Sequence, residues 1–361
     1  MMKPIIISFL LLLLCIILPA VELKFIDQVM LTGGGEDDFI KAVGTFAVTE
    51  DGLYLVVDLK EGDIKIFDLK GRFVKRVGGK GHGPGEFIQP RGCDYLDRQL
   101  VVMDLDRRVY MLLNREKDSM LKESKLLRYV YVGNDVALMK NEKLLMEGYK
   151  ADKDGKEWGL FTYDFKTRQY DYLVPKEIKF GFKTVKDYKK VEEDISTIGS
   201  SGYCDWWGEY AYLAWRGDLK VFNIHMKTKR IQTFGKKTDN YRQPAATHQL
   251  RKALRERNIH AYKKESDKFS TLIGIFTNKN YLLLTYSKPI AGGEKVKSRM
   301  LQFYTLAGDF INELQITRGE GCGLYLSKDR DDDILYMLQI VYGDDDETDE
   351  KFKITRFKMV K

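Results

Sequence analysis

The 361-residue chain has little cysteine, histidine or proline: four Cys, four His and seven Pro. One cysteine lies in the first twenty residues, and the remaining three, Cys93, Cys204 and Cys322, are more than 100 residues apart. An odd number excludes a complete disulfide framework, and the spacing matches no zinc motif. A packed hydrophobic core must therefore stabilise the fold.

The chain also lacks a large excess of charge of one sign. Lys and Arg number 60 against 53 Asp and Glu, interspersed along the chain, for a net charge of +7. A nucleic-acid-binding protein is expected to show a concentrated basic patch, so nucleic acid is not a predicted partner. Hydrophobic residues at 44% exclude wholesale disorder and a multi-span membrane protein. What is abundant is 21 Tyr, 19 Phe and 31 Gly, a mixture that favours β-strands joined by tight turns.

The first twenty residues have the layout of a secretory signal. Lys3 is followed by an apolar run over residues 5–18 and by the small residue Ala20. The run is short for a transmembrane helix. We predict cleavage after Ala20 and an extracytoplasmic location, periplasmic or secreted, with no membrane span in the mature chain. An uncleaved leader that anchors the chain is one alternative. Lipidation at Cys15 is another, although Leu precedes it where Gly, Ala or Ser is expected.

An internal repeat organises the rest of the chain. Phe39 is followed five residues later by Gly44, and Phe87 five residues later by Gly92, an offset of 48 in both pairs. An apolar run closed by Asp and an alternating strand follow each pair. Weaker copies continue to the end of the chain and give six units of four strands. The sixth unit is one strand short, and residues 22–31 are free to supply it.

Six such units predict an all-β fold, a six-bladed β-propeller whose N-terminal strand closes the last blade. Closure removes the exposed sheet edge that invites aggregation. An open pair of β-sandwiches explains neither the offset nor the missing strand. We predict one domain over residues 21–361, monomeric, with insertions at about 175–202 and 235–270. The spacing of apolar residues predicts a helix over 243–268, between blades 4 and 5.

One linker carries a family resemblance. Residues 78–92 read GGKGHGPGEFIQPRG, which resembles the linker of NHL repeats. The resemblance implies a propeller similar to the divergent secreted six-bladed propellers of bacteria. Glycines are expected where the chain crosses between blades with a positive φ. The predicted structural linker residues are Gly81, Gly83, Pro84, Gly85, Phe87, Pro90 and Gly92. The run is not a phosphate loop, because neither Gly-Lys-Ser/Thr nor a helix follows.

Loop length indicates which face binds a partner. Turns between the first and second strands and between the third and fourth strands are short. Long segments occur among the second-to-third loops and the linkers between blades, which share one face of a propeller. Loops on a rigid scaffold carry function, and Trp and Arg are enriched at binding hot spots. The predicted binding residues are Arg107, Arg108, Trp158, Trp215, Arg216 and Arg242. Trp206 and Trp207 are expected in the blade core.

No catalytic motif is found. The four histidines are dispersed, and Gly-x-Ser-x-Gly is absent. The acidic runs 329–333 and 344–350 are oxygen-rich segments of the kind that Ca²⁺ favours, but neither follows an EF-hand pattern, and solvated loops are the default. The three cysteines fall near the inner strands of blades 2, 4 and 6, where free Cys usually behaves as a small buried hydrophobe. We predict no metal site and no cofactor.

The sequence therefore predicts a non-enzymatic extracytoplasmic propeller that binds a protein, peptide or glycan through the face with the long loops. The alternative is a metal-dependent propeller enzyme, a lyase or a lactonase-like hydrolase, with acids or His around the channel mouth. The same fold hosts both classes, so the fold alone does not choose between them.

Overall fold

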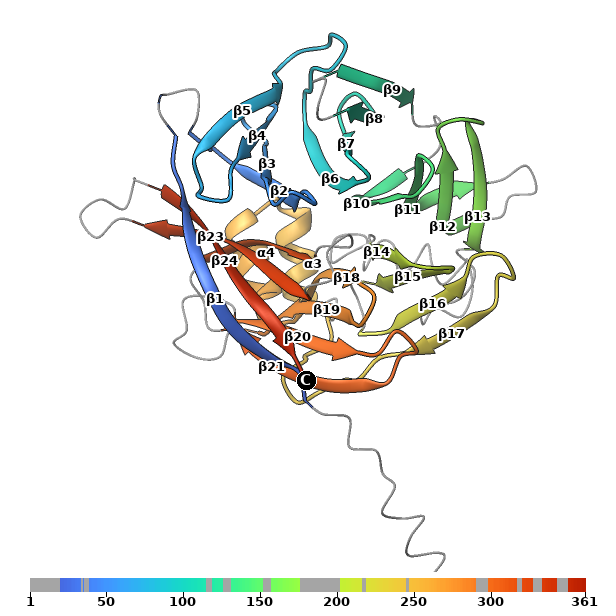
Figure 1. Ribbon diagram of the computed structural model, residues 1–361. Helices are drawn as coiled ribbons and strands as arrows, with labels where there is room; N and C mark the ends of the chain where they lie inside the picture. The colour runs from blue at the N-terminus through green and yellow to red at the C-terminus, as the bar shows by residue number, and fades with distance from the viewer. Residues whose placement is uncertain are drawn as a thin grey trace, which may run out of the picture.

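The computed structural model describes residues 20–33, 35, 39–114, 119–125, 131–151, 157–175, 202–215, 219–244, 247–289, 298–316, 320–326, 333–342 and 350–361. Its strands form six four-stranded antiparallel sheets arranged around a central axis (Figure 1). The predicted six-bladed β-propeller is confirmed.

Within blades 1 to 5 the strands follow one another in chain order from the axis outward. Blade 1 has β2 (Val43–Val48), β3 (Tyr54–Asp58), β4 (Asp63–Phe67) and β5 (Phe73–Gly78). Blade 2 has β6 (Pro90–Leu96), β7 (Gln99–Asp104), β8 (Val109–Asn114) and β9 (Ser119–Lys125). Blade 3 has β10 (Tyr131–Met139), β11 (Lys143–Ala151), β12 (Glu157–Asp164) and β13 (Gln169–Pro175).

The remaining blades continue this order, except for the last strand of blade 6. Blade 4 has β14 (Gly202–Trp207), β15 (Tyr210–Trp215), β16 (Val221–His225) and β17 (Ile231–Phe234). Blade 5 has β18 (Thr271–Thr277), β19 (Leu282–Ser287), β20 (Arg299–Tyr304) and β21 (Phe310–Ile316). Blade 6 has β22 (Glu320–Leu326), β23 (Ile334–Tyr342), β24 (Glu350–Val360) and, outermost, β1 (Glu22–Leu31).

Tight turns join the inner two strands of each described hairpin. Asp97 and Arg98 have φ of 50° and 62°, and Asn141 and Glu142 have φ of 62° and 59°. Two consecutive positive φ values are the conformation of a type I′ turn, whose twist matches that of the strands on either side. The short first-to-second turns expected from the sequence are found at these positions.

The core lies between neighbouring blades. The middle strands β3 and β4 are buried along their whole length. Aromatic side chains connect the last blade to the first: the rings of Phe46 and Tyr325 are 6.1 Å apart, and those of Tyr54 and Tyr336 are 6.3 Å apart. The apolar surface of each sheet is thus covered by the next sheet around the ring.

The ring is closed by β1, as the missing strand predicted. β1 runs antiparallel to β24, from Glu22 opposite Val360 to Leu31 opposite Phe352 (Figure 1). An ion pair reinforces this pairing, because Nε of Arg356 donates to Oδ1 of Asp27 at 2.6 Å and its Nη2 contacts Oδ2.

After β1 the chain passes directly onto blade 1. The backbone N–H of Thr32 donates to the carbonyl of Gly71 at 2.7 Å, and that of Phe73 donates to the carbonyl of Thr32 at 3.0 Å. Gly71 has φ of +77°, and a Cβ there would lie 2.0 Å from the carbonyl oxygen of Met30. Only glycine fits this approach, so the outer turn of blade 1 is built to receive β1.

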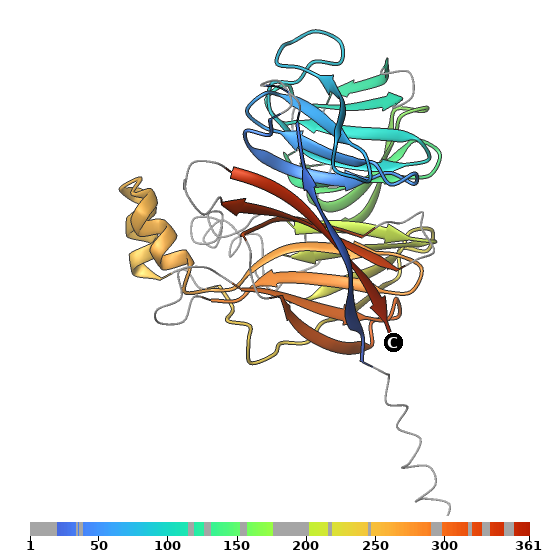
Figure 2. The ribbon, with the colours of Figure 1, turned by 60° about the vertical axis from the view of Figure 1, so that its left-hand side comes forward.

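The helix predicted over 243–268 is wrong in its extent. The structure has two short helices instead, α3 (His248–Arg255) and α4 (Ile259–Ser266). Arg257 has φ of 51°, which ends the first helix, and Asn258 starts the second, with its Oδ1 accepting from the N–H of Ala261 at 3.0 Å. The pair projects from one face of the disc (Figure 2).

Several predictions fall outside the described residues. They include most of the insertion at 175–202, most of the acidic run 329–333 and nearly all of 344–350. No helix in the described ranges is long and apolar enough to cross a bilayer.

The ion pair of Asp27 predicts a pH-dependent contribution to stability. Arg356 lowers the pKa of the Asp27 carboxyl, so its stabilisation is present above the unfolded pKa of Asp and is lost as pH falls through the lowered folded pKa. Because Asp27 is partly exposed, we expect Asp27→Asn to lower the thermal midpoint by only about 1–3 °C at pH 7. The difference from the wild type should shrink as the pH is brought below about 4.

The matched control is Glu22→Gln on the same strand, measured by the same thermal melts. An equal loss with Glu22→Gln, or a loss by Asp27→Asn that does not change with pH, would contradict the assignment.

Candidate functional site

The alternation of strands gives the disc two different faces. The linkers between blades and the second-to-third loops lie on one face, named here the linker face. The first-to-second and third-to-fourth turns lie on the other, named here the turn face. The helices α3 and α4 belong to the linker between blades 4 and 5 and therefore lie on the linker face (Figure 2).

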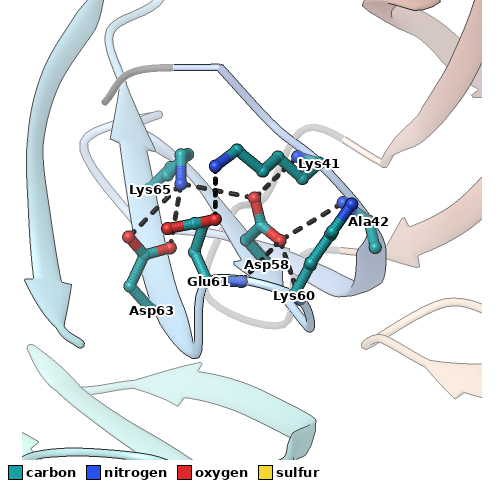
Figure 3. Close-up of polar contacts among 7 residues, drawn as sticks. All are labelled: Lys41, Ala42, Asp58, Lys60, Glu61, Asp63 and Lys65. Carbon is teal, nitrogen blue, oxygen red and sulfur yellow. Dashed lines mark hydrogen bonds and ion pairs between the residues drawn. The ribbon is translucent and has the colours of Figure 1, made fainter. Parts of the chain in front are cut away.

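Two buried carboxylates hold the linkers of blades 1 and 2. Asp58 ends β3 and accepts from the backbone N–H groups of Lys41 at 2.7 Å and Ala42 at 3.2 Å, in the preceding linker (Figure 3). It also accepts from those of Lys60 at 3.0 Å and Glu61 at 3.3 Å, in the loop that follows. Four N–H groups without a strand partner are thus satisfied by one side chain.

Asp104 repeats this arrangement one blade further on. It accepts from the backbone N–H groups of Ile88 at 2.6 Å and Gln89 at 3.2 Å, and from those of Asp106 and Arg107 at 3.1 Å each. The apolar run closed by Asp, which identified the repeat in the sequence, therefore ends in the residue that fastens the linker.

In blade 1 a lysine lies among these acids. Nζ of Lys65 is 3.3 Å from Asp58 and 3.0 Å from Asp63, and the three side chains are at most 1% exposed. Lys41 pairs with Glu61 at 2.5 Å beside them (Figure 3). Burial raises the pKa of the Asp63 carboxyl, and Lys65 opposes that shift. The side chains of Lys65, Asp58 and Asp63 are closed to solvent, so their charges serve the fold and are out of reach of a ligand.

Arg107, a predicted binding residue, contacts the glycine-rich linker. Its Nη1 donates to the carbonyl of Glu86 at 2.6 Å and to that of Gly83 at 3.2 Å. Its Nη2 donates to Glu123 at 2.8 Å, and the side chain is 13% exposed. The guanidinium thereby fixes the path of the linker across blade 2.

Of the other predicted binding residues, those that the structure describes lie on the linker face, at the ends of different blades. Arg108 is exposed in the loop after β7. Arg242 is exposed in the linker before α3, with its guanidinium 5.3 Å from the ring centre of Phe269. Trp158 and Trp215 belong to β12 and β15, and their side chains are outside the described part, as is the whole of Arg216.

The predicted linker residues occupy the crossing between blades 1 and 2. Phe87 is fully buried, and its ring lies where a Cβ on Gly78 would be, at 2.3 Å. The carboxylate of Glu86 accepts from the N–H of Gly83 at 2.7 Å and fills the space beside Gly81. Gly85 has φ of +77°, Pro84 is exposed, and Pro90 and Gly92 are buried at the start of β6.

The central channel holds a cavity of about 60 Å³ lined by all six inner strands. Such a volume has room for a few water molecules and is far smaller than a typical ligand pocket. Cys93 and Cys204 both line it, so the expectation that these two lie near the axis agrees with the structure. Within the described ranges, no group of three His, Cys, Asp or Glu side chains is placed to share a metal ion.

Two carboxylates on the channel wall were missed in the sequence. Oδ2 of Asp94 accepts from the N–H of Leu138 in the next blade at 2.8 Å. Oδ2 of Asp205 accepts from the N–H of Thr277, again one blade on, at 2.6 Å. Trp206 is buried, as expected, and its Nε1 donates to the carbonyl of Leu138 at 2.9 Å. The available signal was the repeated order Cys-Asp-aromatic at 93–95 and 204–206.

A second missed group fixes the linker that leads to the helices. The carboxylate of Glu313 accepts from Tyr286 at 2.7 Å, Gln302 at 2.8 Å, Asn240 at 2.9 Å and Thr238 at 3.0 Å. Burial raises the pKa of the Tyr286 hydroxyl, so that it keeps its proton and remains a donor. Thr238 and Asn240 are linker residues, so this network holds the linker on blade 5.

The helices themselves are fastened at their base. The N–H of Arg242 donates to Oγ of Ser270 at 3.0 Å, and the N–H of Ser270 donates to the carbonyl of Arg242 at 2.9 Å. Leu250 and Ala253 of α3 are buried, whereas α4 buries none of its residues. We name residues 247–268 the hairpin.

Replacement of Asp104 tests the importance of the linker carboxylates. Asp104→Asn leaves an amide N–H₂ facing backbone donors in a buried site, and we expect the thermal midpoint to fall by about 5–10 °C. Asp106→Asn, in the same turn but exposed, is the control and should melt like the wild type. If Asp104→Asn is as stable as the wild type, the carboxylate does not hold the linker.

Comparison with known proteins agrees with this architecture. Residues 35–202 match the model of the DUF5128 family, described as a 6-bladed beta-propeller. A search of curated proteins gives no match. A solved structure of a DUF4221 family member from Bacteroides vulgatus is similar with a TM-score of 0.65 and 14% identity, over 95% of this chain and 99% of the other.

A predicted exported protein from Bacteroides fragilis is similar with a TM-score of 0.60 and 18% identity, over 95% of this chain and 96% of the other. At these identities the likeness shows the fold alone. The chain is a six-bladed β-propeller whose residues 35–202 match the DUF5128 family.

Proposed function

We propose that the chain is an extracytoplasmic binding module whose linker face engages a protein, peptide or glycan. The observation that carries the proposal is the hairpin, which is added to the linker face between blades 4 and 5 (Figure 2). Neither of its helices packs extensively against a strand of the propeller, although the two contact each other. The hairpin therefore adds surface to the disc and little to its core.

The exposure of α4 supports this interpretation. A helix that stabilises a fold normally buries an apolar stripe against it. None of the eight residues of α4 is buried, and Ile259 at its start is 78% exposed. Short isolated helices are marginal in water, so their retention on an exposed face is better explained by contact with a partner than by stability.

The start of β1 lies away from the proposed binding face. Glu22 pairs with Val360 at the turn-face end of blade 6, on the opposite side of the disc from the hairpin. The described chain therefore enters β1 on the side of the disc away from the hairpin. No contact among the described residues favours the metal-dependent lyase or lactonase alternative.

Excision of the hairpin tests the proposal. Because Arg242 and Ser270 are hydrogen-bonded to each other, a short glycine turn can replace residues 244–268 and leave the ring closed. We expect a thermal midpoint within about 2 °C of the wild type. On arrays of glycans and peptides, the labelled wild-type protein should bind a subset that the excised variant no longer binds.

The control for this experiment changes exposed lysines on the turn face instead. Lys166→Gln and Lys227→Gln change exposed residues of the third-to-fourth turns and should leave the array pattern unchanged. An intact protein that binds nothing on the arrays, or an excised variant with the wild-type pattern, would argue against the proposal.

A further inference from the structure

The hairpin concentrates the positive charge of the chain. Residues 247–268 contain seven Lys and Arg against three Asp and Glu, a net charge of +4 in 22 residues, where the whole chain has +7. The remaining sequence is close to neutral. A local excess of this size raises the concentration of anions at the hairpin surface.

Two carboxylates of the hairpin pair with lysines, and other cations of the hairpin have no such partner among the described residues. Glu256 lies 3.9 Å from Lys252, and Glu265 lies 2.6 Å from Lys268. Four other cations are exposed and, within the part of the chain that the structure describes, have no carboxylate in ion-pair distance. They are Arg255, Arg257, Lys263 and Lys264.

These four cations are spread along the hairpin and are not gathered at one point. Arg255 ends α3 and Arg257 lies in the three-residue connection, whereas Lys263 and Lys264 lie in the last turn of α4. The two helices lie side by side and stand out from the disc (Figure 2). The geometry therefore suits an extended ligand with repeated negative charges more than a single small anion.

The scarcity of apolar surface disfavours two other partner classes. A helix that lies on a membrane presents a broad apolar face, and the core of a protein interface is rich in aromatic and apolar side chains. Ile259 is the one strongly exposed large hydrophobic residue among the described side chains of the hairpin. A polar, repeatedly charged chain needs no such face.

We infer that the hairpin binds an acidic polysaccharide, a glycan with a carboxylate or sulfate on its repeating sugars. Guanidinium groups bind carboxylate and sulfate through paired hydrogen bonds, and ammonium groups add point charges. Each exposed contact is weak, and several along one chain add through their proximity. Nucleic acid shares the polyanionic chemistry, but the predicted export signal favours a glycan. The inference rests on the proposed function and names the partner class of the linker face.

The test measures binding of the full chain to immobilised polygalacturonate, dextran sulfate and neutral dextran, at several salt concentrations. We expect binding to one or both acidic polymers, none to neutral dextran, and weaker binding as salt rises. A quadruple variant neutralises the free cations of the hairpin: Arg255→Gln, Arg257→Gln, Lys263→Gln and Lys264→Gln. It should bind about tenfold more weakly, or worse, with a smaller salt dependence.

A second quadruple variant is matched in charge and placed on the turn face: Lys70→Gln, Lys140→Gln, Lys166→Gln and Lys227→Gln. All four lysines are exposed, and the change in net charge is the same. This variant should bind like the wild type. Thermal melts of both variants establish that each is folded.

Four results would overturn the inference. Equal losses of polymer binding in the two quadruple variants would reveal a general charge effect, and an intact chain that binds neither acidic polymer would remove the ligand. Tighter binding to single-stranded DNA than to the acidic polymers would favour nucleic acid, and binding to phosphatidylglycerol vesicles that Ile259→Ser abolishes would favour a membrane. The proposed function survives any of these if excision of the hairpin still removes array binding to a peptide or a neutral glycan. It fails with the inference only if the intact chain binds nothing on the arrays.

Discussion

Backbone N–H groups in the linkers between blades are the groups on which the ring depends, because a linker leaves one sheet before it enters the next and has no strand partner. Asp58 and Asp104, each at the end of a second strand, each accept from two of them and from two more N–H groups in the loop that follows. The carboxylates on the channel wall do the same between inner strands. Neighbouring sheets are therefore joined by buried acids as well as by apolar packing.

The two clearest repeats surround those acids with different side chains. In blade 1 the residue opposite Val56 is Lys65, whose ammonium lies between Asp58 and Asp63. In blade 2 the residue opposite Val102 is Met111, and the guanidinium of Arg107 contacts the linker carbonyls of Gly83 and Glu86 and the carboxylate of Glu123. The equivalent positions carry different side chains, yet each linker is held by the same aspartate contacts, so the repeat keeps the acid while its surroundings differ.

Much of the fold was predictable because glycine, phenylalanine and aspartate recur at fixed positions around the linkers between blades. The offset of 48 residues and the missing last strand gave the number of blades and the closure by β1. The role of Arg107 was not predictable. In the sequence, an arginine three residues after a buried Asp cannot be distinguished from an exposed cation, because its hydrogen-bond partners lie in other parts of the chain. The break at Arg257 and Asn258 was missed because the apolar spacing continues across it, although Asn is a common helix N-cap. The Asp94 and Asp205 contacts join different blades, and a single sequence does not show which blade a side chain faces.

The division of labour between ring and hairpin follows from the same contacts. The carboxylates on the channel wall accept hydrogen bonds from backbone N–H groups of the ring. The channel cavity of about 60 Å³ leaves little space for a ligand. The hairpin leaves the ring and returns to it between two residues that are hydrogen-bonded to each other, Arg242 and Ser270. Its two ends are therefore held together by contacts that do not involve residues 247–268. Surface segments on a rigid scaffold are the usual place for binding residues, and the hairpin carries most of the net positive charge of the chain.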